Sequence, residues 1–287
     1  MSLRSRARWR LIRSGASGGA WNMALDEALL ESVAVHGAPP TLRLYAWEPP
    51  CLSIGYAQAA QVVDETRLAA LGWALVRRPT GGRAILHTDE LTYAVIAPLT
   101  HADLSHGVLP SYRTLSAGLV RALSLLGISP EIQPEPHTRL GLDGQPICFE
   151  VPSAYEITAE GKKLIGSAQL RRRGALLQHG SLPLQGDLGR IALCLRFPDE
   201  QDREEAMRRV RSRADTVAGR LGRTVSWEEA AEAMAEGFGQ SLEIDFVPGE
   251  PTEEELRMAR EKRSQHSAAW DESNRSKVAE GWIKGRA

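Results

Sequence analysis

The segment VRRPTGGRAILHTDELTY, residues 76–93, combines a pair of glycines with three arginines and then runs into apolar residues. Gly81 and Gly82 lack a Cβ, so the backbone there can adopt φ > 0 and a ligand can approach it closely. Exposed N–H groups beside guanidinium groups suit a carbonyl, a carboxylate or a phosphate. A hairpin turn with solvated arginines would explain the same residues, and both interpretations stay open at this point.

The candidate binding residues of this segment are Arg77, Arg78, Gly81, Gly82, Arg83 and His87. A second histidine, His179, also follows an apolar run, a position where histidine is often a hydrogen-bonded structural residue. Neither histidine has a partner at metal-ligand spacing, so no metal site is expected.

The composition places few restrictions on function. The chain has 287 residues and a net charge of −1, so no overall field favours nucleic acid or a membrane. Its three cysteines are too few and too far apart for a disulfide framework, which favours a reducing cytoplasm. The sequence shows neither a signal peptide nor a run of about 18 apolar residues. A cytoplasmic location is therefore expected. A monomer is the default expectation, because no long exposed apolar helix requires a partner.

The order of elements predicts an α+β fold with a mostly antiparallel or mixed sheet. Helical periodicity predicts helices over residues 21–35, 64–71 and 111–126. Apolar strands are predicted over 9–13, 41–47, 51–55, 73–77, 83–86 and 91–97, with a Gly/Ser-rich loop at 14–20. An antiparallel meander of four short strands is predicted over 155–158, 163–165, 168–171 and 175–178.

Two domains of unequal size are expected. Residues 1–250 would form the catalytic domain, with its core at about 9–185, and residues 251–287 would form a helical C-terminal extension. Ser226 with Glu229 and Thr252 with Glu255 have the spacing of capping boxes, which predicts a helix start at each pair. Trp270 and Trp282 are the large apolar anchors of the polar tail.

Cys148 follows a long proline-rich connection and precedes the meander. A lone cysteine is usually a small buried apolar residue. The alternative is a nucleophile, since a thiolate can take an acyl group from a thioester at little thermodynamic cost. That role needs a cationic or hydrogen-bonding neighbour to lower the thiol pKa.

Lys162 and Lys163 would face opposite ways in a strand, so one can point inward while the other reaches solvent. Lys163 precedes apolar Leu164 and Ile165 and is the predicted inward lysine, where it could polarise an acyl carbonyl. Gly166, Ser167 and Ala168 would let a ligand lie against the backbone. An ordinary hairpin with two solvated lysines is the competing interpretation. Those three residues and His179 complete the candidate binding set.

Several segments together resemble the superfamily of lipoate–protein ligases, biotin–protein ligases and octanoyltransferases. RRPTGGRAILH followed by ELTYAV is similar to its signature, and WNMALDEALL and LRLYAWEPPCLSIGYAQ resemble the segments before it. EGKKLIGSAQLRRRGALLQHGSLPL resembles the lysine-bearing segment after it. The resemblance covers roughly residues 9–185 and implies a biotin/lipoate ligase-like catalytic domain in which a sheet cradles an acyl chain.

Within this superfamily, CFEVPSAYEI resembles the segment with the nucleophilic cysteine in LipM-type octanoyltransferases. The resemblance implies that Cys148 attacks the thioester of octanoyl-acyl carrier protein while Lys163 holds the carbonyl oxygen. A lysine of a lipoyl domain, such as that of glycine cleavage H protein, would then take the octanoyl group, with no cofactor. Thr88 follows His87 where many relatives have an acidic residue, which is a departure from the family pattern.

Three alternatives follow from the same residues. An ATP-dependent lipoate–protein ligase would share the glycine signature and have no use for Cys148. A lipoyl-domain amidotransferase would keep the cysteine but change donor and acceptor. A non-catalytic module that binds carrier proteins would keep the scaffold alone.

Overall fold

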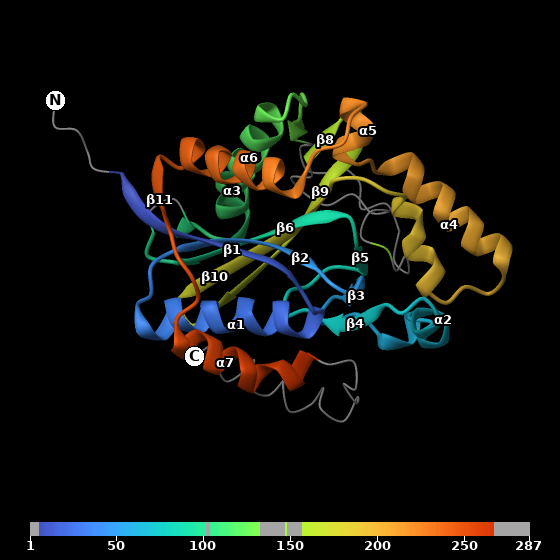
Figure 1. The fold of residues 1–287 in the computed structure, drawn as a ribbon, viewed down its shortest axis with the longest axis horizontal. Helices are drawn as coiled ribbons and strands as arrows, with labels where there is room; N and C mark the ends of the chain where they lie inside the picture. The colour runs from blue at the N-terminus through green and yellow to red at the C-terminus, as the bar shows by residue number, and fades with distance from the viewer. Residues whose placement is uncertain (1–5, 102–103, 133–146, 148–156, 267–287) are drawn as a thin grey trace.

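The protein is described by a computed structural model, which places residues 6–101, 104–132, 147 and 157–266. An eight-stranded sheet lies at the centre, in the order β11-β1-β2-β6-β10-β9-β8-β7 (Figure 1). β1 is parallel to β2 and β11, and the other neighbours are antiparallel. Its strands are β1 (Ala7–Ser17), β2 (Thr41–Trp47), β6 (Glu90–Pro98), β7 (Glu131–Ile132), β8 (Ile157–Ala159), β9 (Lys162–Arg172), β10 (Ala175–Pro183) and β11 (Ile244–Pro248). The predicted α+β class with a mixed sheet is confirmed.

Helices cover both faces of this sheet (Figure 1). On one face α1 (Gly19–His36) packs against Tyr45, Ala94 and Leu177, with α7 (Glu253–Lys262) outside it. On the other face α3 (Val108–Leu125) and α6 (Trp227–Ser241) pack against Leu44 and Tyr93. Because both faces are covered, central strands such as β6 are buried along nearly their whole length. The other helices are η1 (Ala60–Val62), α2 (Glu65–Ala70), η4 (Leu188–Cys194), α4 (Glu200–Arg213), α5 (Val217–Leu221) and η5 (Arg263–His266).

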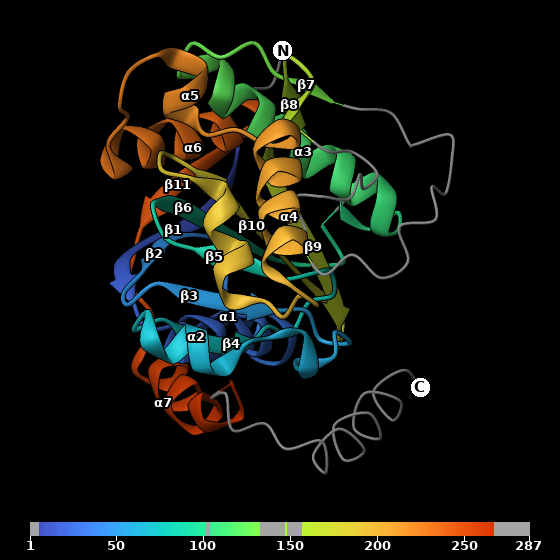
Figure 2. The same cartoon turned by 90° about the vertical axis from the view of Figure 1, so that its right-hand side faces the viewer.

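A separate three-stranded sheet carries residues 78–84, the glycine segment. Figure 2 shows strands β3 and β4 of this sheet close to α2. β3 (Cys51–Ile54) lies in the middle, with β4 (Ala74–Arg77) parallel on one side and β5 (Ile85–His87) antiparallel on the other. β4 and β5 therefore do not pair with each other. The hairpin interpretation of the glycine pair is wrong, because residues 78–84 pass across β3.

Two local predictions are wrong. The predicted loop at residues 14–20 is the end of β1 followed directly by the start of α1. Gly15 has φ 64° and β1 shifts register there against β2, so the glycine forms a bulge within the strand. The predicted strands 163–165 and 168–171 are one strand, β9, because β10 pairs with Gly166 and Ser167 without interruption. Residues 155 and 156 of the predicted meander lie outside the described residues.

The described C-terminal segment is fixed to the first helix and strand. The capping box predicted at Thr252 and Glu255 is confirmed, and Glu255 also binds the Arg10 guanidinium of β1 at 2.7 Å. The buried His266 ring lies between two acceptors, the Arg77 carbonyl oxygen at 3.0 Å from Nδ1 and Glu27 Oε2 at 2.8 Å from Nε2. The predicted anchors Trp270 and Trp282 lie outside the described residues.

Candidate functional site

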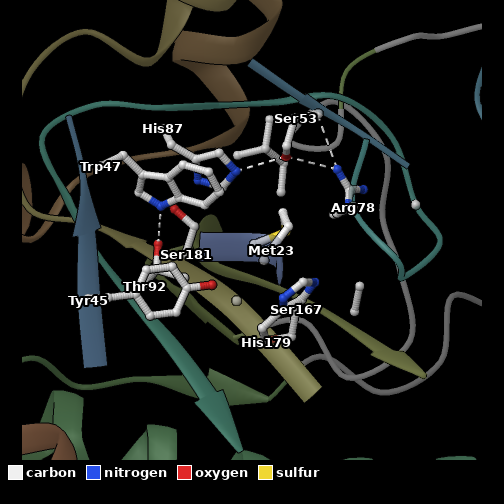
Figure 3. A pocket seen from close by; sticks show the side chains of 15 residues that line it. Met23, Tyr45, Trp47, Ser53, Arg78, His87, Thr92, Ser167, His179 and Ser181 are labelled. Atoms are coloured by element: carbon white, nitrogen blue, oxygen red, sulfur yellow. Dashed lines mark hydrogen bonds between the residues drawn. The ribbon is translucent and has the colours of Figure 1, made fainter. Parts of the chain in front are cut away.

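A pocket lies between the central sheet, α1 and the three-stranded sheet (Figure 3), and its empty space is about 420 Å³ when the part open to solvent is included. Its wall is partly apolar and partly a set of hydroxyl, imidazole and guanidinium groups. It is lined by Met23, Tyr45, Trp47, Ser53, Arg78, Gly82, Ile85, His87, Thr92, Gly166, Ser167, Ala168, His179, Gly180 and Ser181. A partly open pocket of this kind suits a short alkyl chain that ends in a polar group.

Arg78 holds the glycine segment in shape. Its Nε and Nη2 donate to the Gly81 carbonyl oxygen at 3.2 and 2.9 Å, and Nη2 donates to the Arg83 carbonyl oxygen at 2.7 Å. Its Nη1 reaches Ser53 Oγ at 3.1 Å (Figure 3). The side chain is buried, so these bonds satisfy a charge that water does not reach.

Gly55 shows how tightly the glycine segment packs on the end of β3. A Cβ at Gly55 would lie 1.9 Å from the Gly82 carbonyl oxygen, whereas a Cβ at Gly81 would meet no atom within 4 Å. We expect Gly55→Ala to lower the free energy of unfolding by about 2 kcal/mol or more, because backbone must move. Gly81→Ala should change it by less than about 1 kcal/mol in the same chemical denaturation experiment. Equal effects would contradict this packing.

One buried hydrogen-bonded chain runs along the cavity wall from Arg78 to Glu90. Ser53 Oγ lies 2.8 Å from His87 Nε2, and His87 Nδ1 lies 2.8 Å from Glu90 Oε1. The His87 ring stacks on Trp47 with centroids 4.0 Å apart. Glu90 also accepts hydrogen bonds from the hydroxyls of Thr92 and Ser181. These donors, His87 first among them, outweigh burial and lower the pKa of Glu90, which is therefore ionised.

A second chain of the same kind reaches the glycine segment from α1. His179 Nε2 lies 2.7 Å from Thr80 Oγ1, and Nδ1 lies 3.1 Å from Asp26 Oδ2. Asp26 is fully buried on α1 and is held by Arg43 at 2.7 Å and by the Tyr45 hydroxyl at 2.9 Å. Burial alone would raise the pKa of Asp26, but Arg43 and His179 lower it. The glycine segment is thus linked to two imidazole–carboxylate pairs, at Arg78 through Ser53 and at Thr80 directly.

His179 predicts a pH dependence of stability. Burial lowers its pKa below 6.5, although Asp26 partly opposes the shift, so the folded protein holds an uncharged ring near neutrality. The stability that this provides is present above pH 6.5 and is lost as the pH falls through the folded-state pKa, because the unfolded chain takes up the proton first. For each proton that the unfolded state binds and the folded state does not, the free energy of unfolding changes by about 1.4 kcal/mol per pH unit. Chemical denaturation at several pH values should show that, below pH 6.5, the free energy of unfolding changes less steeply with pH in His179→Gln than in the wild type. Parallel curves of this free energy against pH would refute the assignment.

The structure brings seven of the predicted binding residues to the cavity wall. These are Arg78, Gly82, His87, Gly166, Ser167, Ala168 and His179. Arg77, Gly81 and Arg83 are not among the residues that line the cavity in the described part of the chain. The Arg77 guanidinium instead donates to the carbonyl oxygens of Gly55, Tyr56 and Gln58, so it fixes the connection after β3.

The two lysines of β9 differ as their alternation predicts. Lys163 is 4% exposed, whereas Lys162 is half-buried and its Nζ lies 3.8 Å from Asp215 Oδ2. Lys163 is absent from the cavity lining of the described residues, but it precedes the lining residue Gly166 by three positions on the same strand. Its predicted role at an acyl carbonyl stays a prediction.

Cys148, the predicted nucleophile, lies outside the described residues. Ile147, the residue bonded to it, is fully buried and pairs with Ala84 in parallel orientation. Ala84 is adjacent to Ile85, which lines the cavity, so the chain passes the glycine segment immediately before Cys148. The other two cysteines are buried, as their apolar contexts predict.

Sequence reasoning missed the buried groups behind the two histidines. Asp26 lies within the helix predicted over residues 21–35 and is a fully buried partner of His179. Glu90 and Ser53 were not singled out at all. A carboxylate inside the apolar run of residues 21–35, or at the start of the buried strand β6, is the signal that could have identified Asp26 and Glu90. In the placed part of the chain no group of three or more His, Cys, Asp or Glu side chains could hold a metal ion.

Two kinds of comparison with known proteins agree. Residues 19–239 match the model of the lipoyl protein ligase A/B catalytic domain. A protein of Kyrpidia tusciae named octanoyltransferase LipM is 43% identical over 264 residues, which cover 91% of this chain and 96% of that protein. The protein of the same name in Brevibacillus brevis is 39% identical and covers 88% of this chain and 94% of its own.

Solved structures of ligases share the architecture. A bipartite lipoate–protein ligase of Thermoplasma acidophilum, solved in a study of that enzyme and its E2 lipoyl domain, is 27% identical with a TM-score of 0.73. The match covers 91% of this chain and 93% of that one. A lipoate–protein ligase A bound with ATP is 28% identical with a TM-score of 0.71, over 91% and 95% of the two chains.

Proposed function

The chain belongs to the lipoyl protein ligase A/B catalytic domain family, and from that premise we propose that it transfers octanoyl groups through a thioester on Cys148. Octanoyl transfer in lipoate biosynthesis is its reaction. The observation that carries this conclusion is the match to relatives named octanoyltransferase, at 39–43% identity over 88–91% of the chain. The covalent intermediate and its residues go beyond those relatives' names and rest on this chain's own sequence and geometry.

The cavity supplies a place for the octanoyl chain. Met23, Trp47 and Ile85 offer apolar wall, and each buried CH₂ group contributes about 0.8 kcal/mol to binding. Arg78 and the backbone at Gly82 form a polar part of the same wall, where the acyl carbonyl would lie. This orientation puts the reacting carbon beside the glycine segment, the segment that Ile147 also contacts.

Two acyl transfers then complete the reaction. The Cys148 thiolate attacks the carbonyl carbon of the octanoyl thioester, a new S–C bond forms, the S–C bond of the donor breaks, and the donor leaves as a thiolate that takes a proton from solvent. An uncharged lysine amine attacks the enzyme thioester, an N–C bond forms, the C–S bond to Cys148 breaks, and the Cys148 thiolate takes the proton from nitrogen. Lys163 would stabilise the oxyanion in both steps. Amide formation from a thioester is downhill, so the reaction needs no ATP.

The expected acceptors are lipoyl-domain proteins. The glycine cleavage H protein is the proposed acceptor, and octanoyl-acyl carrier protein is the proposed donor. A monomeric state and a cytoplasmic location stay predictions. Among the placed residues, no helix combines the length and the apolar character needed to cross a membrane.

Intact-protein mass spectrometry tests this function. The purified enzyme is mixed with octanoyl-acyl carrier protein without ATP, and we expect an octanoyl adduct on Cys148 that hydroxylamine removes. Adding the H protein should move the octanoyl group to its lysine. An adduct that forms only from a lipoylated or octanoylated protein would instead identify the amidotransferase.

The similarity to the Thermoplasma acidophilum ligase favours one second candidate, an ATP-dependent lipoate–protein ligase. It predicts no adduct in this experiment and activity only with ATP and free lipoate or octanoate. Release of pyrophosphate under those conditions, with Cys148 dispensable, would replace the proposed mechanism.

A further inference from the structure

Ser53, His87 and Glu90 are joined by hydrogen bonds in the order of a proton-transfer relay. A hydroxyl lies 2.8 Å from one imidazole nitrogen, and a carboxylate lies 2.8 Å from the other. Because the ionised Glu90 can only accept, His87 Nδ1 must donate to it. Nε2 is then free to accept the Ser53 hydroxyl proton, while Ser53 Oγ accepts from Arg78 at 3.1 Å. If the ring is uncharged, every bond in this arrangement has one donor and one acceptor.

The relay faces the acyl cavity. Ser53, His87 and Arg78 all line it, and Figure 3 shows Ser53 between the other two side chains. Glu90 lies behind His87 and is 5% exposed, so its charge orients the ring. This resembles the hydroxyl–imidazole–carboxylate order that enzymes use to move a proton during acyl transfer.

The proposed reaction needs such a group. A lysine side chain arrives mostly as ammonium, because its ordinary pKa is about 10.4, and only the uncharged amine attacks a thioester. We propose that Ser53 and His87 accept the proton that the acceptor lysine must lose, with Glu90 as a positioning residue. This inference rests on the proposed octanoyl transfer and assigns its second step a proton acceptor.

The protons balance as follows. The ammonium gives one proton to Ser53 Oγ while Ser53 gives its own to His87 Nε2, and the resulting imidazolium is paired with Glu90. The uncharged amine attacks the carbonyl carbon, the N–C bond forms and the C–S bond breaks. The leaving thiolate takes the second proton from nitrogen, and the imidazolium releases the first to solvent. Arg78, Glu90 and His179 are the charged or titratable groups on the neighbouring elements that act on this ring.

The test measures discharge of octanoyl-enzyme that has already been fully loaded, so that differences in loading do not enter. Loaded wild type, Ser53→Ala, Ser53→Thr and Glu90→Gln are each mixed with the H protein, and the adduct is followed by mass spectrometry. We expect Ser53→Ala to discharge about 100-fold more slowly, which is the usual contribution of a positioned base. Ser53→Thr keeps the hydroxyl and should recover most of the rate, and Glu90→Gln should be slower than wild type.

Two further measurements separate proton transfer from mere structural support. Hydroxylamine is uncharged at neutral pH and needs no base, so it should discharge wild type and Ser53→Ala at equal rates. The pH at which discharge to the H protein reaches half its maximum should rise in Ser53→Ala. Ser116→Ala removes another buried hydroxyl, on α3, and should behave as wild type throughout.

Three results would overturn the assignment. The first is discharge of Ser53→Ala to the H protein at the wild-type rate. The second is that the discharge rate of Ser53→Ala falls by the same factor with hydroxylamine as with the H protein, which would mean that the relay residues only support the structure. The third is a wild-type enzyme that takes up no octanoyl group, which would refute the proposed function itself and the relay with it.

Discussion

Replacing Cys148 with alanine should abolish octanoyl transfer and leave no covalent adduct. The thiolate is the group that forms the new bond, so its loss should lower the rate by about three orders of magnitude or more. The measurement is the transfer rate from octanoyl-acyl carrier protein to the H protein, together with the mass of the enzyme.

Cys194 provides the matched control. Burial raises the pKa of its thiol to about 12, so it is protonated at neutral pH and a poor nucleophile. Burial raises the pKa of Cys51 as well. Cys194→Ala should therefore keep the adduct and most of the activity. Full activity in Cys148→Ala would return that residue to a structural role and favour the ligase.

Replacing Lys163 with methionine should reduce transfer about 100- to 1000-fold, because methionine keeps the apolar stem but removes the positive charge. That is the usual effect of removing one group that stabilises an oxyanion. The loss should appear in kcat and in the rate of adduct formation, since both steps pass through an oxyanion.

Lys162→Met is the matched control, one residue away on the same strand. Lys162 is half-buried and its ion pair with Asp215 is long, at 3.8 Å, so its removal should have little effect on the rate or on stability. Equal losses in the two variants would mean that β9 needs its lysines for folding alone.

The sequence predicted the positions of helices and strands correctly where the apolar residues followed a single periodicity. The helix predicted over residues 21–35 is α1, and the strand predicted over 41–47 is β2 with the same bounds. The prediction was wrong at Gly15 and at Gly166 with Ser167, where small residues suggested a loop or a break between strands. Pairing with β2 keeps the first segment in a strand, and pairing with β10, the next strand along the chain, keeps the second segment extended.

Part of the lining of the candidate site was predictable from sequence, but the hydrogen bonds that connect its residues were not. Seven predicted residues line the cavity because the glycine segment, β9 and β10 meet there. The sequence did not indicate that Arg77 would turn away while its neighbour Arg78 bound the glycine segment, since both arginines precede the same glycines. The partners that fix Arg78 and the histidines come from β3, β6 and α1, which only the folded topology places together.

Asp26 and Glu27 are neighbours on α1 that bind different histidines. Asp26 holds His179 at the cavity, and Glu27 holds His266 near the end of the described chain. Anyone who shortens the protein for crystallisation, or fuses a partner to its C-terminus, should keep every residue through 266. Truncation before His266 would remove the imidazole that binds the buried Glu27 carboxylate and the Arg77 carbonyl oxygen. The loss of these contacts outside the cavity would loosen the segment that shapes it.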